Sequence, residues 1–327
     1  MNGISVIIPT KNRAHLLRMT LVNILSQTLK PLEIIVVDDG SADGTKEMIE
    51  SEFTESVRYV RNQGKGPGAA RNTGFNLSRG QFIQFFDSDD IMTINKLEVQ
   101  ARLLSADENV DLVYGPYVMV EQSDNDWKQL DVIMQFSCLP DRPLNILVAE
   151  GWCSITQSCL FKRSVIEKAG PWREDLMPHE DKEYWYRLGK AIKSALHENQ
   201  SCVFYRQHRH QITDLHVKEL ARTRDAIIAF DLIIDQMKKD GVSLVSRIIC
   251  EGIRAGYVKY LNDHHQNDLK NSFFDKVFYN FYRVKQKLGR IKTKTNWQPF
   301  HGALVSDEKF NEYKFILNSQ KFSDAGK

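Results

Sequence analysis

The sequence predicts an α/β protein with a mostly parallel central sheet flanked by helices, followed by a helical C-terminal region. Within the first 115 residues, short apolar runs alternate with segments whose apolar residues recur at helical spacing. Such alternation favours a parallel sheet that helices cover on both faces. Beyond residue 214, the apolar residues recur at helical spacing over about 215–239, 242–262 and 268–290.

Local patterns place the individual elements. Compact apolar runs predict five strands: Ile4–Ile8, Glu33–Val37, Val57–Val60, Gln81–Phe86 and Val110–Tyr114. Helices are expected between them, over residues 13–27, from Asp43 or Thr45 to about Glu52, after the glycine-rich segment 64–72, and over 93–105. Residues 116–150 lose this rhythm and have the composition of surface turns. A loop over 151–161 then enters a strand, and a short helix ends at Gly170.

Composition limits the class of protein. The 327 residues allow one large α/β domain with an appendage, or two modest domains. A hydrophobic content of 42% is ordinary for a globular protein, and a net charge of +2 gives no reason to expect a nucleic-acid partner. No apolar run reaches the length of a membrane-spanning helix, and the N-terminus lacks the pattern of a signal peptide. Five cysteines without a CxxC pair indicate reduced thiols, so we expect a cytoplasmic location.

Three carboxylates, Asp87, Asp89 and Asp90, follow the fourth predicted strand. Clustered carboxylates repel one another, and hard oxygen ligands suit Mg²⁺ or Mn²⁺. Because ligands bind at the carboxyl ends of the strands in open α/β sheets, this cluster predicts a metal and a nucleotide. The alternative interpretation is a solvated acidic turn in which Asp89 or Asp90 caps the next helix.

Polar residues also follow the first two strands. Thr10, Asn12 and Arg13 come after the first, and Asp38 and Asp39 after the second. In a parallel sheet these ends share one edge, so residues far apart in sequence converge on one cleft. Capping explains any single cluster, but it does not readily explain several clusters at the same end of their strands.

Four segments, in this order, resemble the motifs of family 2 glycosyltransferases: Ser5–Arg13, Ile34–Ser41, Gly68–Gly74 and Phe85–Asp90. The resemblance spans about residues 4–90 and continues more weakly to about 213. It implies a GT-A fold and a nucleotide-sugar donor. It also implies a catalytic domain over 1–214, with a nucleotide-binding half (1–115) and an acceptor half (116–214), before a helical region (215–327).

The resemblance implies a set of nucleotide-sugar-binding residues: Pro9, Thr10, Asn12, Arg13, Asp39, Arg71, Asp87 and Ser88. Asp39 would accept the N3–H of uracil, which favours a UDP-sugar, and Pro9 and Thr10 would border the base. Arg13 and Arg71 would bind the diphosphate or hold the acids of the site. Asp89 would bind the Mn²⁺ or Mg²⁺ that bridges the phosphates. The glycine spacing of the Gly64–Gly68 loop fits neither the GxGxxG motif nor a Walker loop, so we expect a flexible turn there rather than a phosphate-binding loop.

The second half would supply the acceptor side. At the start of a predicted helix, Glu180-Asp181 resembles the acidic pair of the family. The resemblance implies that Asp181 is the general base and that Glu180 orients either this base or the acceptor hydroxyl. The alternative is that the two carboxylates only cap the helix. Tyr205–His208 resembles a further motif, which implies His208 as a metal or diphosphate ligand, and a solvated histidine is the alternative. Trp152 and Trp172 either stack on a sugar or pack in the core, and we favour packing.

These roles predict an inverting transfer of a hexose-type sugar to a hydroxyl of a glycan, lipid-linked or protein acceptor. A carboxylate removes the proton of the acceptor while a cation offsets the charge of the leaving diphosphate. A nucleotidyltransferase is disfavoured because no GxGTR-like loop follows the first strand, and a non-catalytic binding module would be expected to lose the acids. Residues 270–294 carry eight Lys or Arg and interleaved aromatics. They predict either peripheral contact with the inner face of a membrane or packing, including packing in a homo-oligomer.

Overall fold

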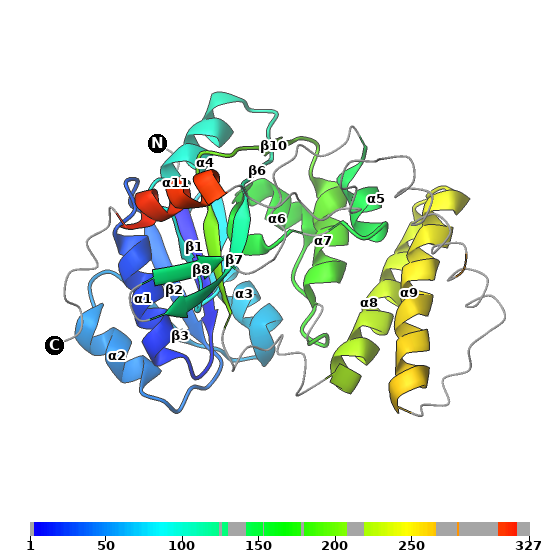
Figure 1. The fold of residues 1–327 in the computed structure, drawn as a ribbon, viewed down its shortest axis with the longest axis horizontal. Helices are drawn as coiled ribbons and strands as arrows, with labels where there is room; N and C mark the ends of the chain where they lie inside the picture. Colours follow the sequence, from blue (N-terminus) through cyan, green and yellow to red (C-terminus); the bar gives the residue numbers. More distant parts are fainter. Residues whose placement is uncertain are drawn as a thin grey trace.

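The structure is a computed structural model that describes residues 3–123, 126–129, 142–152, 154–177, 180–207, 219–265, 280 and 307–318. A seven-stranded sheet forms its centre, in the order β10-β6-β9-β4-β1-β2-β3 (Figure 1). Its strands are β1 (Ile4–Thr10), β2 (Glu33–Asp38), β3 (Arg58–Arg61), β4 (Phe82–Phe85), β6 (Leu112–Tyr114), β9 (Cys159–Lys162) and β10 (Ala195–His197). All five predicted strands are present, and every pairing is parallel except those of β9.

Helices cover both faces of this sheet, as predicted. One face packs on α1 (Ala14–Leu25), α2 (Thr45–Glu52) and α4 (Lys96–Ala106) through Val6, Ile8, Val36 and their neighbours. The other face packs on α3 (Gly66–Leu77), α5 (Leu144–Ala149), α6 (Arg163–Ala169) and α7 (Glu180–Ala191). The two faces alternate along each strand because successive side chains of a strand point to opposite sides.

Helix α3 crosses β1 at very short range. A Cβ atom on Gly74 would lie 2.3 Å from Cγ2 of Ile7, so the mid-helix glycine permits this close packing. Gly66 begins the helix with a φ of +84°, a conformation that glycine adopts without strain. The glycine-rich segment is therefore the entrance of a packed helix. The expectation of a flexible turn there is wrong.

A second, four-stranded sheet was not predicted. It has the order β5-β11-β7-β8, formed by β5 (Ile91–Met92), β11 (Val203–Gln207), β7 (Tyr117–Ser123) and β8 (Asp126–Gln129). Helix α11 (Asp307–Asn318) packs on it, since Phe310 and Tyr313 join a buried cluster with Val118 and Phe204. A chain segment near the C-terminus therefore returns to pack on this second sheet.

Helices α8 (Glu219–Lys239) and α9 (Leu244–His265) lie side by side at the end of the molecule away from β3 (Figure 1). They confirm the first two predicted C-terminal helices, whereas the third, over 268–290, lies outside the described residues except for Asn280. Phe230 and Ile233 of α8 enter the core cluster that contains Tyr186 of α7. None of the helices in the described ranges combines the length and the apolar character that a bilayer-spanning helix needs.

Candidate active site

The acidic triad of Asp87, Asp89 and Asp90 lies in the turn between β4 and β5. One carboxylate oxygen from each residue can be chosen so that all three lie within 4.8 Å of one another. Asp90 is fully buried, and helix α4 starts only at Lys96. The interpretation of this segment as a capped, solvated turn is therefore wrong.

The donor set of the triad fits a hard divalent cation. Carboxylate oxygens are the ligands that Mg²⁺ and Mn²⁺ prefer. Burial, together with the negative charges of Asp89 and Asp87, raises the pKa of Asp90 well above its usual range. A cation at the triad would relieve this repulsion.

Arginines surround the triad on several sides. Arg13 Nη1 lies 2.5 Å from Oδ2 of Asp89, and Arg71 Nη2 lies 3.1 Å from Oδ1 of Asp87. The backbone N–H of Arg206 donates to Oδ1 of Asp90 at 3.0 Å, while its buried guanidinium donates to the carbonyl oxygen of Asp89. Arg206 is not among the predicted site residues, although it lies in the segment that contains His208.

Arg71 also connects the triad to helix α7. Its Nη1 lies 3.0 Å from Oε1 of Glu180, and both side chains are buried. Burial raises the pKa of Glu180 against the opposing charge of Arg71. Asp181 is half-buried, and its Oδ1 accepts a hydrogen bond from the backbone N–H of Lys182 at 2.8 Å. The acidic pair thus divides into an inward ion pair at Glu180 and a more accessible carboxylate at Asp181.

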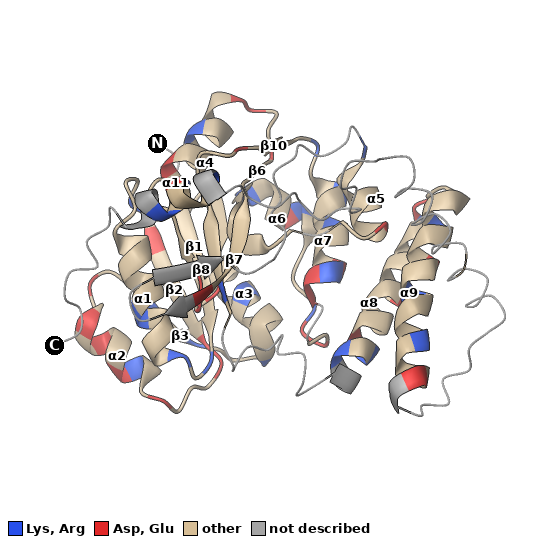
Figure 2. Ribbon diagram, viewed as in Figure 1, with Lys and Arg blue, Asp and Glu red and all other residues tan. Residues whose placement is uncertain are grey.

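The surroundings of Arg71 place Trp172 in the core. Arg71 stacks over the Trp172 ring at 4.6 Å, and that ring stacks on Tyr184 with their centroids 3.8 Å apart. Trp152 packs edge-on against Trp185. Both tryptophans are at most 5% exposed, so the packing interpretation is confirmed for each. Farther along α7, Glu183 and Arg187 form an ion pair. Figure 2 shows that acidic and basic positions lie next to each other on this helix.

Asp39 lies at the carboxyl end of β2, facing the start of α3. Its carboxylate accepts hydrogen bonds from Lys11 Nζ at 3.1 Å, Asn62 Nδ2 at 2.9 Å and the backbone N–H of Gly66 at 3.0 Å. Burial opposes ionisation, but these bonds outweigh it and lower the pKa of Asp39. Asn62 follows β3 at the same edge of the sheet, so the strand-end rule that selected Asp39 could have identified it.

The loop after β1 provides the remaining strand-end residues. Asn12 has a φ of 52°, its N–H donates to Ser41 Oγ, and its Oδ1 accepts from the N–H of Ala42, both at 2.8 Å. Pro9 pairs with Val37 in the sheet, and the Thr10 hydroxyl is buried with no hydrogen-bond partner among the described residues. The first two strand-end loops are thus joined, as the sequence predicts.

Two other predicted site residues are Ser88 and His208. Ser88 is 1% exposed, and its carbonyl oxygen accepts a hydrogen bond from Thr20 Oγ1 at 3.1 Å. Its side chain is thus buried rather than open to a ligand. His208 lies outside the described residues, as does His210.

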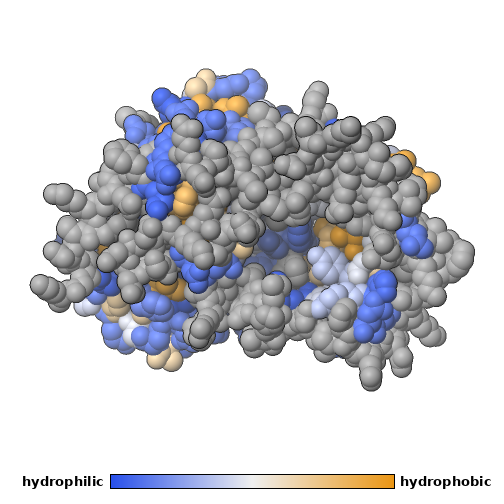
Figure 3. All heavy atoms as spheres, in the orientation of Figure 1, coloured by the Kyte–Doolittle hydropathy of each residue, from blue (hydrophilic) through white to orange (hydrophobic). Residues whose placement is uncertain are grey.

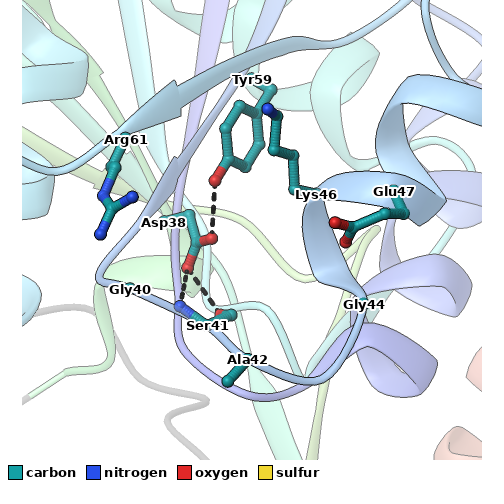
Figure 4. Close-up of a pocket in the computed structure, with 9 residues that line it drawn as sticks. All are labelled: Asp38, Gly40, Ser41, Ala42, Gly44, Lys46, Glu47, Tyr59 and Arg61. Atoms are coloured by element: carbon teal, nitrogen blue, oxygen red, sulfur yellow. Dashed lines mark hydrogen bonds between the residues drawn. The ribbon is translucent and has the colours of Figure 1, made fainter.

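A cavity of about 480 Å³ opens on the other side of β2 (Figure 4). Its walls include Asp38, Ser41, Tyr59 and Arg61, and Asp38 accepts hydrogen bonds from Tyr59 and Ser41. Asp39, by contrast, does not line the cavity, and its side-chain partners Lys11, Asn62 and Gly66 differ from those of Asp38. Figure 3 shows a hollow near the centre of the molecule, with hydrophilic residues at its bottom.

Two solved structures have the same fold as this chain. The structure of residues 1–349 of S. aureus TarS in complex with UDP-GlcNAc gives a TM-score of 0.55 at 15% identity, covering 86% of this chain and 79% of that one. The mannosyltransferase PcManGT of Pyrobaculum calidifontis, in complex with GDP-Man and Mn²⁺, gives 0.52 at 17% identity, covering 97% and 85%. The fold is therefore of the GT-A type.

The sequence is also similar to bacterial glycosyltransferases. The UDP-Glc:alpha-D-GlcNAc-diphosphoundecaprenol beta-1,3-glucosyltransferase WfgD of Escherichia coli is 29% identical over 227 residues, which cover 68% of this chain and 85% of that protein. The family model for glycosyl transferase family 2 matches residues 5–170, slightly more than half of the chain. That range contains Asp39, Arg71 and the acidic triad. The protein is therefore a glycosyltransferase and belongs to family 2.

Proposed function

We propose that the protein transfers a hexose-type sugar from a UDP-sugar to an acceptor hydroxyl, with inversion at the anomeric carbon. The observation that carries this proposal is the position of Arg71, which contacts Asp87 of the triad and Glu180 of α7 at the same time. One side chain thus links the edge expected to bind the donor to the helix expected to supply the base. Residues 1–214 would form the catalytic domain, with halves 1–115 and 116–214, and residues 215–327 a helical region.

Asp39 would recognise the base. Its ionised carboxylate is an acceptor, so it pairs with the N3–H of uracil, and Pro9 and Thr10 would border the ring. Asn62 Nδ2 and the backbone N–H of Gly66 both donate to Oδ1 of this carboxylate. Relatives support a UDP-sugar: the E. coli enzyme is named for UDP-Glc, and TarS was solved with UDP-GlcNAc.

The triad would hold a divalent cation beside the diphosphate, chiefly through Asp89 with His208. Bound there, Mn²⁺ or Mg²⁺ would offset the negative charge that develops on the leaving diphosphate. The PcManGT structure with Mn²⁺ supports manganese for this fold. Arg13 and Arg71 would donate charge-assisted hydrogen bonds to the phosphate oxygens, Asn12 would hold the loop that carries Arg13, and Asp87 would accept from a ribose or sugar hydroxyl.

Asp181 would act as the general base. A sugar hydroxyl is a weak nucleophile, so a carboxylate has to accept its proton as the new bond to the anomeric carbon forms. Asp181 is more accessible than Glu180, whose carboxylate is held by Arg71. Glu180 would therefore orient the base rather than replace it. With base and diphosphate on opposite sides of the anomeric carbon, a single displacement inverts the configuration.

The acceptor would be a glycan, a lipid-linked saccharide or a protein. The name of the E. coli relative, which specifies a diphosphoundecaprenol acceptor, supports the lipid-linked class. Such an acceptor would bring the enzyme to the inner face of a membrane. The basic, aromatic segment 270–294 is proposed to make that peripheral contact.

Release of free UDP from a panel of UDP-hexoses, with GDP-mannose as a control donor, tests the proposal. The purified protein should release UDP with Mn²⁺ and stop when a chelator is added. A nucleotidyltransferase would instead release pyrophosphate from a nucleoside triphosphate, and a binding module would release neither product. UDP release at the same rate with chelator would contradict the metal assignment.

A further inference from the structure

Gln157 contacts two acids of the triad at once. Its Nε2 lies 2.5 Å from Oδ2 of Asp87 and 2.9 Å from Oδ2 of Asp90. A primary amide has two N–H bonds, so it can donate to both carboxylates together, while each carboxylate keeps other lone pairs for a cation. The side chain is only 3% exposed and contributes no charge. Gln157 thus fixes the relative orientation of Asp87 and Asp90.

The turn that carries Gln157 (Thr156–Ser158) is itself held by two buried glutamines. Gln84 Nε2 donates to the carbonyl oxygen of Gln157 at 3.1 Å, and Gln100 Nε2 donates to the carbonyl oxygen of Ser158 at 3.0 Å. Thr156 Oγ1 donates to Oε1 of Gln157 at 3.2 Å. These bonds fix both the turn and the direction of the Gln157 amide group.

Lys96 determines how the two glutamines are oriented. Its Nζ lies 2.5 Å from Oε1 of Gln84 and 2.9 Å from Oε1 of Gln100, and the side chain is 1% exposed. Because the amine donates to both amide oxygens, each glutamine must turn its NH₂ group toward the turn. A neutral amine still has two N–H bonds, so the arrangement persists whether or not Lys96 is charged.

We propose that Gln157 is a positioning residue for the acidic triad, and that Lys96 with Gln84 and Gln100 forms a clamp that holds Gln157 in place. This inference rests on the proposed function, in which the triad binds a divalent cation. Gln157 acts through Asp87 and Asp90 and need not touch the donor. Partners of this kind orient the metal ligands, and their loss typically weakens metal binding by about 10–100-fold.

Binding of Mn²⁺ alone to the full chain tests the clamp without any turnover. Free Mn²⁺ is measured by electron paramagnetic resonance during a titration of wild type, Gln157→Met and Gln200→Met. Gln157→Met keeps the length of the side chain and removes both donors, so the affinity should fall by about 10–100-fold. Gln200 is exposed, so Gln200→Met should match the wild type.

Two further variants leave Gln157 itself unchanged, so they test the clamp even if Gln157→Met fails to fold. Thr156→Val removes only the hydroxyl that directs the Gln157 amide, and Lys96→Met removes only the donor to the two glutamines. Both should weaken Mn²⁺ binding in the same direction but by less. Thermal midpoints with and without UDP show that each variant is folded.

The outcomes separate the two proposals. If the wild type binds Mn²⁺ and the Gln157 and Thr156 variants bind it equally well, the positioning role is refuted while the glycosyl transfer proposal stands. If only Lys96→Met is unchanged, the clamp is refuted and Gln157 acts alone. If the wild type itself binds no Mn²⁺, both the metal assignment and this inference fail, and UDP release with chelator present would then show whether transfer survives.

Discussion

Nη1 of Arg71 lies 3.0 Å from Oε1 of Glu180, and this buried ion pair joins residues 109 positions apart in the sequence. The other end of the same guanidinium lies 3.1 Å from Oδ1 of Asp87. Arg71 therefore neutralises one carboxylate from each half of the site. Removing it leaves the buried Glu180 without its ion-pair partner, while the partly exposed Asp87 keeps its hydrogen bond from Gln157.

Arg71→Met should cost about 3–5 kcal/mol of unfolding free energy, because it leaves the carboxylate of Glu180 buried and unpaired. Urea denaturation measures this cost. In a double-mutant cycle, adding Glu180→Gln should restore part of the loss, with a coupling energy of about 0.5–3 kcal/mol. The exposed ion pair of Arg173 and Asp175 is the matched control, and Arg173→Met should cost no more than about 1 kcal/mol. Strict additivity in the cycle would contradict the bridging role.

Asp181→Asn should lower kcat by about 10²–10⁴-fold, the usual contribution of a general base, while the affinity for UDP stays unchanged. Initial rates of sugar transfer and calorimetric titration with UDP measure the two quantities separately. Asp175→Asn, on an exposed loop six residues earlier, is the control. A variant with normal kcat and weakened UDP binding would show that Asp181 binds the donor and is not the general base.

Asp39→Asn should weaken UDP binding by about 10–100-fold, because the amide gives a weaker hydrogen bond than the carboxylate and presents N–H groups as well. Calorimetry with UDP measures the loss. Asp38→Asn is the control: Asp38 is hydrogen-bonded to Tyr59 and Ser41 and shares no side-chain partner with Asp39, so its loss should leave UDP affinity unchanged. If the two variants lose affinity equally, the base is bound elsewhere.

Lys96 should make stability depend on pH in the alkaline range. Burial lowers the pKa of Lys96 to about 7 from its ordinary value of 10.5. Between these values the unfolded chain holds one more proton than the folded chain, so through this group stability rises with pH, by up to about 1.4 kcal/mol per pH unit. Below pH 7 both states are protonated, and the penalty for the buried charge is complete and constant.

Urea denaturation of wild type and Lys96→Met at pH 7, 8 and 9 measures this dependence. The wild type should gain stability relative to the variant as the pH rises. Lys46→Met, at an exposed lysine, should run parallel to the wild type. If the stability of Lys96→Met also changes with pH in parallel with that of the wild type, the Lys96 amine does not titrate between pH 7 and its ordinary pKa of 10.5.

The sequence predicts the first four strands of the central sheet well because their signals are local. Compact apolar runs bounded by turn residues mark β1 and β2, and the residues that follow them gather at one edge of the sheet. Short strands cannot be recognised from such local patterns. For example, β5 has only two residues and forms because it pairs with β11. The antiparallel insertion of β9 between β4 and β6 is likewise set by tertiary packing.

The residues of the candidate site likewise include some that local sequence patterns identify and some that they do not. Asp39 and Asp89 stand next to apolar strands, so their position in the sequence identifies them. Gln157 is 67 residues from Asp90 and 70 from Asp87, in a turn with no motif that marks a function. Its importance comes from long-range hydrogen bonds, which a single sequence does not display.

The most direct test of the whole account is the Mn²⁺-dependent release of UDP by Asp89→Ala. Asp89 belongs to the triad and is held by Arg13, so its loss should reduce UDP release by at least about 10²–10³-fold, and added Mn²⁺ should no longer stimulate it. Asp235→Ala, at an exposed aspartate of α8, should behave as the wild type. Turnover by Asp89→Ala at the wild-type rate, still stimulated by Mn²⁺, would contradict the central claim that this acidic triad binds the metal for sugar transfer.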